Sequence, residues 1–300
     1  MQRIGPLIVG FLALGEAPVA GQQATGTTLW RLAGTTLATP PALTVGPAAV
    51  IWNPAQTEDS ARVQLAVEAI QTPSAVDATG FLAAVRARAG KIGQLGFLYG
   101  RVGLSDITQT VDSPDPTGTG VPVYTFAFGG TWSRLIGTTS VGATLAFHET
   151  RLDVSKVNRW TLDFGGSHSF WGDRLRIAAA THFFSSLKVD DPAQDIYAGV
   201  EARLWSGAMG NNRVVVRGRY GISFAHGFTA DHQIGAGAEF ARIVALDLMV
   251  AREGSYGPGS TRVIGGLRVA IGKYRVTLAR DTGVNDLGSA YRVGVEIRLR

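Results

Sequence analysis

Histidine, serine and aspartate are the residues of this sequence that could supply catalysis or hold a metal ion. Neither H-E-x-x-H nor C-x-x-C occurs, and the five histidines are dispersed along the chain. Ser167 and His168 could act as nucleophile and base, but strand alternation would place neighbouring side chains on opposite faces. We therefore predict a protein that is not an enzyme and that holds neither a metal ion nor a cofactor.

Arginine is the other residue type with useful chemistry here. The sequence has 28 basic and 23 acidic residues, for a net charge of +5. Its arginines form no basic run; they recur two residues apart among aspartates and glutamates, which excludes nucleic-acid binding. Positive and negative side chains on the same strand face predict charge pairs that fill a lumen. Such a mixture does not indicate which ligand the lumen would bind. The residues predicted to face this lumen are Arg86, Arg88, Arg217, Arg219, Arg268, Glu201 and Glu239.

The elements that carry these residues are predicted to be strands. Residues 61–300 divide into fourteen stretches of period-two alternation, as in the last one, where Val293 and Val295 oppose Arg292 and Glu296. The connections alternate between short and long. Predicted short ones are Arg88–Ile92, Arg134–Thr138, Phe170–Asp173, Phe240–Arg242 and Ile271–Tyr274; long ones are Gln71–Ala78, Ser105–Gly120, Arg151–Asn158, Ser185–Asp195, Arg252–Thr261 and Asp281–Ala290. Trp205–Asn212 is longer, and Ala225–Ala230 shorter, than this rule requires.

Two barrels fit such strands. A soluble barrel would turn its apolar columns inward, whereas an outer-membrane barrel would turn them toward lipid. The alternation of loop lengths and the aromatic residues at strand ends favour the second, an all-β, transmembrane, antiparallel up-and-down barrel with both ends in the periplasm. The strand-end aromatics are Trp132, Phe170, Trp171, Tyr274 and Tyr291, and the residues predicted to face lipid include Trp160, Phe164, Tyr220, Phe224, Val293, Val295 and Ile297.

The first residues predict export. Arg3 is followed by the apolar run Ile4–Leu14 and by a small-residue cleavage zone, so we expect residues 1–21 to be a signal peptide. This run is shorter than the roughly 18 residues that a membrane-spanning helix needs. Cysteine is absent, which excludes a disulfide scaffold. The predicted location is the outer membrane of a Gram-negative cell.

Residues 22–60 do not alternate. They contain Trp30, Trp52 and short apolar stretches that a solvated tail would avoid. A barrel of about fourteen strands, residues 61–300, has an interior that needs filling. We therefore expect 22–60 to fold inside it as a hatch, with the Asn53 amide bonded to lumen arginines or to free backbone groups.

Leu43–Ala55, which ends in Trp52-Asn53-Pro54-Ala55, resembles the N-terminal hatch of the FadL superfamily of outer-membrane barrels. Gly103–Ile107, Ser140–Leu145 and Leu162–Gly165 are similar to motifs of its PorV/PorQ branch. The chain departs from the pattern at Gln56, where a glycine is usual, and at its non-aromatic last residue, Arg300.

The resemblance implies one of two functions. The first is passage of small hydrophobic molecules past a mobile hatch, with lateral escape through the wall. The glycines of 92–104, namely Gly93, Gly96, Gly100 and Gly103, could let that strand open, although ordinary barrel curvature explains them too. The second is a PorV-like role in which external loops receive secreted proteins. The partners are then outer-membrane lipid and either a small apolar ligand or exported proteins.

Overall fold

The chain is described here from a computed structural model, which describes residues 30, 33–56, 61–72, 77–104, 107, 120–183, 194–210, 212–225, 229–253, 260–283 and 288–299. The predicted signal peptide, 1–21, lies outside the described residues, as do most of 105–119 and Arg300. The predicted all-β fold is confirmed: the described strands form one closed antiparallel barrel of fourteen.

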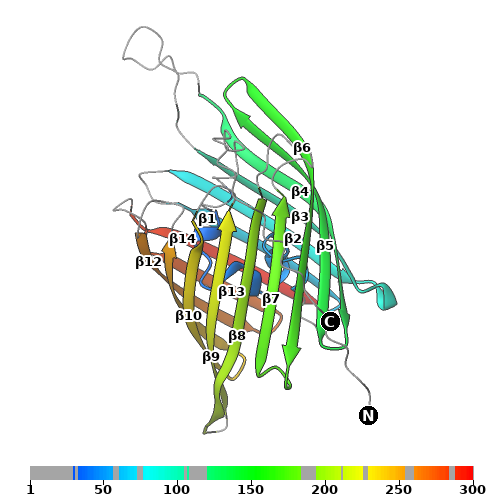
Figure 1. Ribbon diagram of the computed structural model, residues 1–300, viewed down its shortest axis with the longest axis vertical. Helices are drawn as coiled ribbons and strands as arrows, with labels where there is room; N and C mark the ends of the chain where they lie inside the picture. The colour runs from blue at the N-terminus through cyan, green and yellow to red at the C-terminus, as the bar shows by residue number, and fades with distance from the viewer. Residues whose placement is uncertain are drawn as a thin grey trace.

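The strands follow one another around the wall in chain order (Figure 1). Their bounds are β1 Val63–Gln71, β2 Ala78–Arg88, β3 Gln94–Leu104, β4 Val123–Ile136, β5 Thr139–Leu152, β6 Ser155–Phe170, β7 Leu175–Phe183, β8 Gln194–Met209, β9 Asn212–Ala225, β10 Asp231–Phe240, β11 Val244–Glu253, β12 Ser260–Ile271, β13 Tyr274–Asp281 and β14 Ala290–Leu299. β1 pairs with β14 from Val63↔Leu299 to Gln71↔Tyr291, and this ladder closes the barrel.

Trp30 and residues 33–35 of the described chain are α-helical, and the other helical elements are short 3-10 turns. They are η1 (Pro41–Leu43), η2 (Pro47–Ile51) and η3 (Gly90–Ile92). Among the described residues, no helix has both the length and the apolar character needed to cross a membrane.

The connections fall at two ends of the barrel. We call the end that holds the start of β1 and the end of β14 the turn end, and the opposite end the loop end. The connections at the turn end are short; those at 137–138, 210–211 and 272–273 contain two residues each, and Gly137 and Gly272 take φ angles of 63° and 61°. Left-handed φ angles at such positions suit the tight turns of twisted hairpins. Short turns mark the periplasmic side of an outer-membrane barrel.

Two connections differ from the expected lengths. Arg151–Asn158, expected to be a long loop, is a two-residue turn at Asp153–Val154, because β5 and β6 continue pairing to Leu152↔Ser155. Trp205–Asn212 is also a tight turn: a β-bulge between Arg203 and Trp205 shifts the register, after which β8 pairs with β9 to its end. A bulge interrupts period-two alternation, so the sequence pattern predicts a loop where the strands continue to pair.

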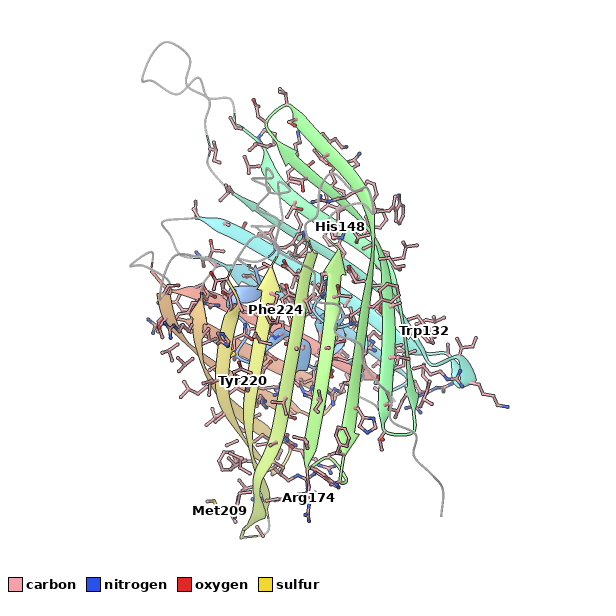
Figure 2. All side chains as sticks on the ribbon, viewed as in Figure 1. Trp132, His148, Arg174, Met209, Tyr220 and Phe224 are labelled. Carbon is pink, nitrogen blue, oxygen red and sulfur yellow. The ribbon has the colours of Figure 1, made fainter. Side chains whose placement is uncertain are left out.

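The outer surface of the wall is apolar. Trp160, Phe97 and Leu248 have exposed fractions of 56%, 48% and 56%, whereas Thr161 and Arg262 are buried. Tyr220 and Phe224 are likewise exposed on the wall (Figure 2). The other residues expected to face lipid are also exposed, except Ile297, which is half-buried. A closed barrel with an apolar exterior and a polar interior satisfies its backbone groups within lipid. The protein is an outer-membrane barrel.

Val295→Arg should therefore destabilise the folded barrel by about 2–4 kcal/mol if this position lies near the bilayer midplane. Val295 is 43% exposed on β14, between Val67 of β1 and Val276 of β13 on the same outer face. The free energy of unfolding in phospholipid vesicles is the measurement, with Val295→Leu as the control. Equal stability of the two variants would mean that this column does not contact lipid.

Candidate functional site

The interior of the barrel is occupied by residues 33–56, which we call the lumen segment (Figure 1). It contains η1 and η2 and contacts the inner face of the wall at β1, β2, β3, β7, β8 and β9. Trp52, Val50 and Asn53 are 2%, 1% and 0% exposed. Burial to this degree shows that the segment is part of the core and not a solvated tail.

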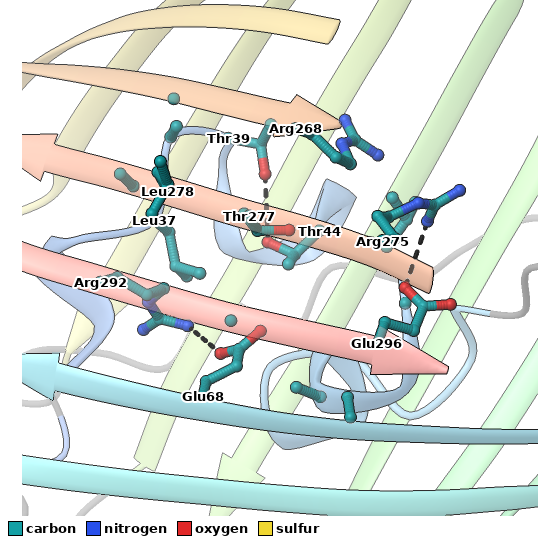
Figure 3. Close-up of a pocket in the computed structure, with 18 of the residues that line it drawn as sticks. Leu37, Thr39, Thr44, Glu68, Arg268, Arg275, Thr277, Leu278, Arg292 and Glu296 are labelled. Carbon is teal, nitrogen blue, oxygen red and sulfur yellow. Dashed lines mark hydrogen bonds and ion pairs between the residues drawn. The ribbon is translucent and has the colours of Figure 1, made fainter. Parts of the chain in front are cut away.

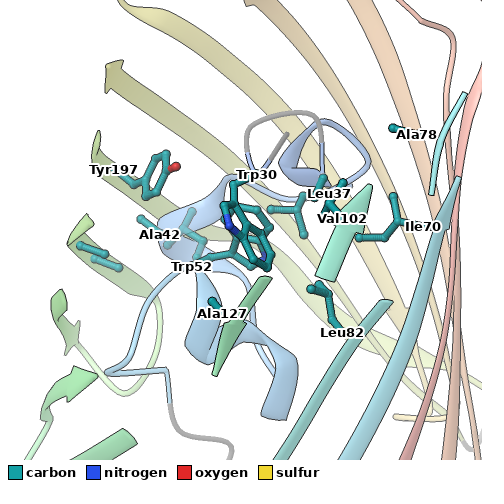
Figure 4. Packing of buried hydrophobic residues seen from close by; sticks show 14 residues of the cluster. Trp30, Leu37, Ala42, Trp52, Ile70, Ala78, Leu82, Val102, Ala127 and Tyr197 are labelled. Carbon is teal, nitrogen blue, oxygen red and sulfur yellow. The ribbon is translucent and has the colours of Figure 1, made fainter. Parts of the chain in front are cut away.

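Apolar side chains attach the lumen segment to the wall (Figure 4). Leu37, Leu43 and Trp52 of the segment, together with Trp30, form one buried cluster with side chains from the strands. The wall residues of this cluster include Ile70, Leu82, Val102, Ala127 and Tyr197. Val50 makes a second contact, with Ala84 and Leu98. The hydrophobic core of the protein therefore lies between this segment and the strands.

Four buried or half-buried arginines hold the backbone of the lumen segment, and we call them the clamp arginines. Arg86 donates to the carbonyl of Gln56, and Arg176 donates to that of Leu43 at 2.9 Å. Arg262 donates to Thr35 O at 2.6 Å, and Arg292 to Ala33 O at 2.5 Å. An irregular chain leaves carbonyl groups without backbone donors, and a buried carbonyl needs a donor. The guanidinium groups supply them.

Carboxylates on the wall balance three of the clamp arginines. Glu68 lies 2.7 Å from Arg292, and Glu201 lies 3.5 Å from Arg176. Arg262 lies between Glu253 and Asp281, with its Nη1 2.8 Å from the Asp281 carboxylate. These contacts fix each guanidinium in the direction of the lumen segment.

The Asn-Pro-Ala turn of the segment is held by its own backbone. The Asn53 amide donates to Ala42 O at 2.8 Å and accepts from Ala55 N at 3.0 Å. Of the two kinds of partner expected for Asn53, lumen arginines and backbone groups, the structure shows backbone groups. Trp52 O lies 2.6 Å from the imidazole Nε2 of His182 on β7. Ser140 on β5 donates its hydroxyl to Ala55 O.

Inward-facing glycines create the space for this segment, and we call them the seat glycines. At each of them a Cβ would come closer than 3.0 Å to an atom of the segment or of Trp30. Gly142 and Gly165 lie beneath Pro54 and Asn53. The others are Gly100 beneath Trp30, Gly199 beneath Leu43, Gly221 beneath Pro40 and Gly266 beneath Ala38. The wall is thus shaped to the segment on six strands.

The remaining lumen-facing residues form a charge network between neighbouring strands. Arg219 lies 2.6 Å from Glu201 and 2.5 Å from Asp247. Arg217 lies 3.3 Å from Glu239, and Arg268 lies 3.3 Å from Asp247. Of the arginines predicted to face the lumen, Arg86 reaches the segment, and Arg88 is exposed at the turn end of β2. The network joins β8 to β12 across the wall.

The glycines expected to let β3 open lie in different settings. Gly93 precedes β3 in the turn, with a φ angle of 117°. Gly100 belongs to the seat, and Gly96 and Gly103 lie against backbone atoms of the adjacent strands. β3 pairs with β2 and β4 along its whole length. Opening of this strand stays a prediction.

Three of the clamp arginines were not predicted from the sequence to contact the lumen segment. Arg262 and Arg292 belong to inward columns, which alternation reveals, and Arg176 lies in a short strand. Nothing in the pattern links them to residues 33–56. Among the described residues, no cluster of histidine, aspartate and glutamate could hold a metal ion.

Cavities differ in size between the two parts of the lumen. Those between the segment and the wall have volumes of about 90, 60 and 20 Å³; the first lies against β12–β14, where Arg292 meets Glu68 (Figure 3). A larger cavity of about 1020 Å³ lies at the turn end, and we call it the vestibule. Its lining includes Glu239, Arg268, Arg275 and Arg298.

No protein-family model and no curated protein matches the sequence. Solved structures match the fold. The toluene transporter TodX of Pseudomonas putida is 11% identical, with 92% of this chain and 98% of that chain covered and a TM-score of 0.56. The monoaromatic hydrocarbon channel CymD is 11% identical (90% and 97% covered, TM-score 0.53), and the toluene transporter TbuX of Ralstonia pickettii is 13% identical (85% and 94% covered, TM-score 0.51). The chain has the FadL-like fold of these outer-membrane barrels.

Proposed function

We propose that the protein lets small hydrophobic molecules cross the outer membrane, with the lumen segment as a movable hatch. The observation that carries this proposal is a barrel whose interior is filled by a separate, non-strand piece of its own chain. A segment that is not paired into the sheet can move without breaking the strand ladders of the wall. The three solved barrels with this fold are described as a monoaromatic hydrocarbon channel and two toluene transporters.

Cavity sizes indicate that the hatch must shift during passage. A cavity of about 150 Å³ is needed to hold benzene. The cavities beside the lumen segment, of about 90, 60 and 20 Å³, are smaller than this, whereas the vestibule of about 1020 Å³ is large enough. A monoaromatic molecule therefore reaches the vestibule from the loop end only when the segment moves away from part of the wall.

The contacts of the segment suit such movement. Trp52, Asn53, Pro54 and Ala55 form the proposed hatch turn, and their wall contacts are hydrogen bonds and van der Waals packing. A hydrogen bond contributes roughly 0.5–1.5 kcal/mol net, so a few of them can be exchanged at low cost. Escape of the ligand through the wall at β3 is the second part of this proposal.

A reversible lock tests the proposal directly. The native chain has no cysteine, so Ala38→Cys with Gly266→Cys introduces a single possible disulfide between hatch and wall. A Cβ at Gly266 would lie 2.5 Å from the Ala38 Cβ, closer than the roughly 3.5–4.5 Å between the Cβ atoms of a disulfide, so the bond forms with a small shift of the segment away from β12. We expect Gram-negative cells that express the oxidised double variant to take up labelled toluene no faster than cells without the protein. Reduction should restore toluene uptake to the level of the Gly266→Cys single variant.

The two single-cysteine variants are the matched controls, and both should take up toluene in either redox state. Intact cells are needed because toluene crosses plain phospholipid bilayers unaided. Equal uptake before and after reduction of the double variant would contradict a moving hatch. Equal uptake with and without the protein would contradict transport itself.

The protein-receiving alternative depends on external loops. Of 105–120, the longest of them, the structure describes Ile107 and Gly120. The similarity to the PorV/PorQ branch rests on three short motifs and stays a prediction. The cavity argument favours small-molecule passage.

A further inference from the structure

The vestibule is separate from the hatch. It is formed at the turn end by the last residues of β10, β12 and β14, the first residues of β11 and β13, and the turns between them. None of its described lining residues belongs to the lumen segment. Its volume of about 1020 Å³ is at the upper limit of ordinary small-molecule sites, which measure roughly 300–1,000 Å³.

The lining of the vestibule is basic. It contains Arg242, Arg268, Lys273, Arg275 and Arg298, against a single described carboxylate, Glu239. That carboxylate is already engaged by Arg217 at 3.3 Å. A cavity lined by one sign of charge within low-dielectric walls concentrates the field and attracts ions of the opposite sign.

The two carboxylates behind the lining are each shared between two arginines. Glu296 serves two arginines, Arg275 at 3.3 Å and Arg298 at 2.6 Å (Figure 3 shows the first pair). Asp247 is likewise shared, between Arg268 and Arg219.

Among the residues that the structure describes, the remaining two lining bases have no carboxylate partner. Arg242 and Lys273 form no ion pair within the described residues; both are exposed, and the Lys273 ammonium lies 5.3 Å from the ring centroid of Tyr274. Among the described residues, no carboxylate therefore compensates the charges that Arg242 and Lys273 add to the lining.

The rest of the lining is apolar. Val244, Ala245 and Ala270 provide surface that a purely inorganic ion would not cover. Guanidinium groups match carboxylates through paired N–H donors, and their planes also stack on aromatic rings. The lining thus offers a polar end and an apolar end to the same ligand.

From this geometry we infer that the vestibule is a binding site for a small organic anion, a carboxylate on an apolar body. The site is open to the turn end, so it takes this ligand without movement of the lumen segment. Binding of an organic anion in the vestibule goes beyond the passage of neutral hydrocarbons, and it can be tested independently of that passage.

Titration calorimetry of the full-length protein in detergent, with benzoate as the probe, tests this site. We expect benzoate to bind, with an affinity that falls as salt rises, and benzyl alcohol of similar shape not to bind. Arg242→Gln with Lys273→Gln should weaken benzoate binding roughly fivefold, because two exposed charges are removed. Both residues lie in surface turns, so the barrel should fold, which heat-modifiable gel migration verifies.

The matched control is Arg151→Gln with Lys156→Gln, which removes two exposed bases from the loop end and should leave benzoate binding unchanged. The inference is overturned if benzoate does not bind, if benzyl alcohol binds equally, or if the turn-end variant binds like the unmodified protein. Binding of an acidic peptide such as hexaglutamate without binding of benzoate would also overturn it, because the occupant would then be a protein. Toluene uptake is not measured in this experiment, so its failure leaves the proposed transport untouched.

Discussion

Gly142→Ala is expected to make the barrel leak ions. A Cβ at this position would lie 2.5 Å from both the carbonyl carbon and the oxygen of Pro54, which are backbone atoms of the lumen segment. Overpacking of this kind costs about 1–3 kcal/mol. If that cost falls on the closed arrangement, the open fraction rises about five- to 150-fold. Conductance of the protein in planar lipid bilayers is the measurement.

Gly166→Ala is the matched control for this prediction. Gly166 lies on the outer face of β6, next to the seat glycine Gly165, and a Cβ there would meet nothing closer than Ser140 O at 3.9 Å. The conductance of the Gly166→Ala variant should equal that of the unmodified barrel. A Gly142→Ala barrel that folds and conducts no more than Gly166→Ala would show that the wall does not depend on a close fit to the segment.

Arg262→Met is expected to cost the largest amount of folding stability, roughly 3–5 kcal/mol. Arg262, Glu253 and Asp281 have side-chain exposures of 4%, 4% and 3%, and Arg262 also donates to Thr35 O. Removing the guanidinium leaves two buried carboxylates without their counter-charge and a buried carbonyl without its donor. Urea unfolding in phospholipid vesicles measures the loss.

An exposed pair provides the comparison. Lys156 lies 2.6 Å from Glu149 near the loop end, and its side chain is 51% exposed. Lys156→Met should cost less than about 1 kcal/mol, because surface ion pairs are weakly stabilising. Replacing Glu253 and Asp281 by leucine together with Arg262→Met should recover part of the larger loss, since no buried charge then lacks a partner. Equal costs for the two single variants would mean that water reaches the Arg262 cluster.

The number of strands could be predicted from the sequence because lipid on one side and a polar lumen on the other impose period-two alternation. The same constraint explains the two errors. At the loop end, β6 begins with the polar residues Ser155, Lys156 and Asn158. They show no apolar column, so the sequence pattern predicts a loop where the chain forms a paired strand. At Trp205 the bulge moves the apolar column by one residue.

The candidate site could be predicted less completely. Inward columns identify arginines such as Arg262 and Arg292, but their acceptors, Thr35 and Ala33, are 227 and 259 residues away in sequence. An irregular segment has no repeating sequence pattern, so the sequence does not predict which wall residues it contacts. Seat glycines raise a similar difficulty: Gly100 was interpreted as a point of strand flexibility, whereas its missing side chain makes room for Trp30.

The closing ladder between β1 and β14 has a consequence for how the molecule is assembled. The lumen segment precedes β1 and contacts strands all around the wall, and four of the wall's arginines depend on its carbonyl groups. A cylinder sealed around an empty interior would leave each of those guanidinium groups without the carbonyl that it binds on the segment. We therefore expect insertion into the membrane and filling of the interior to be coupled, with closure completed when β1 pairs with β14 around the segment.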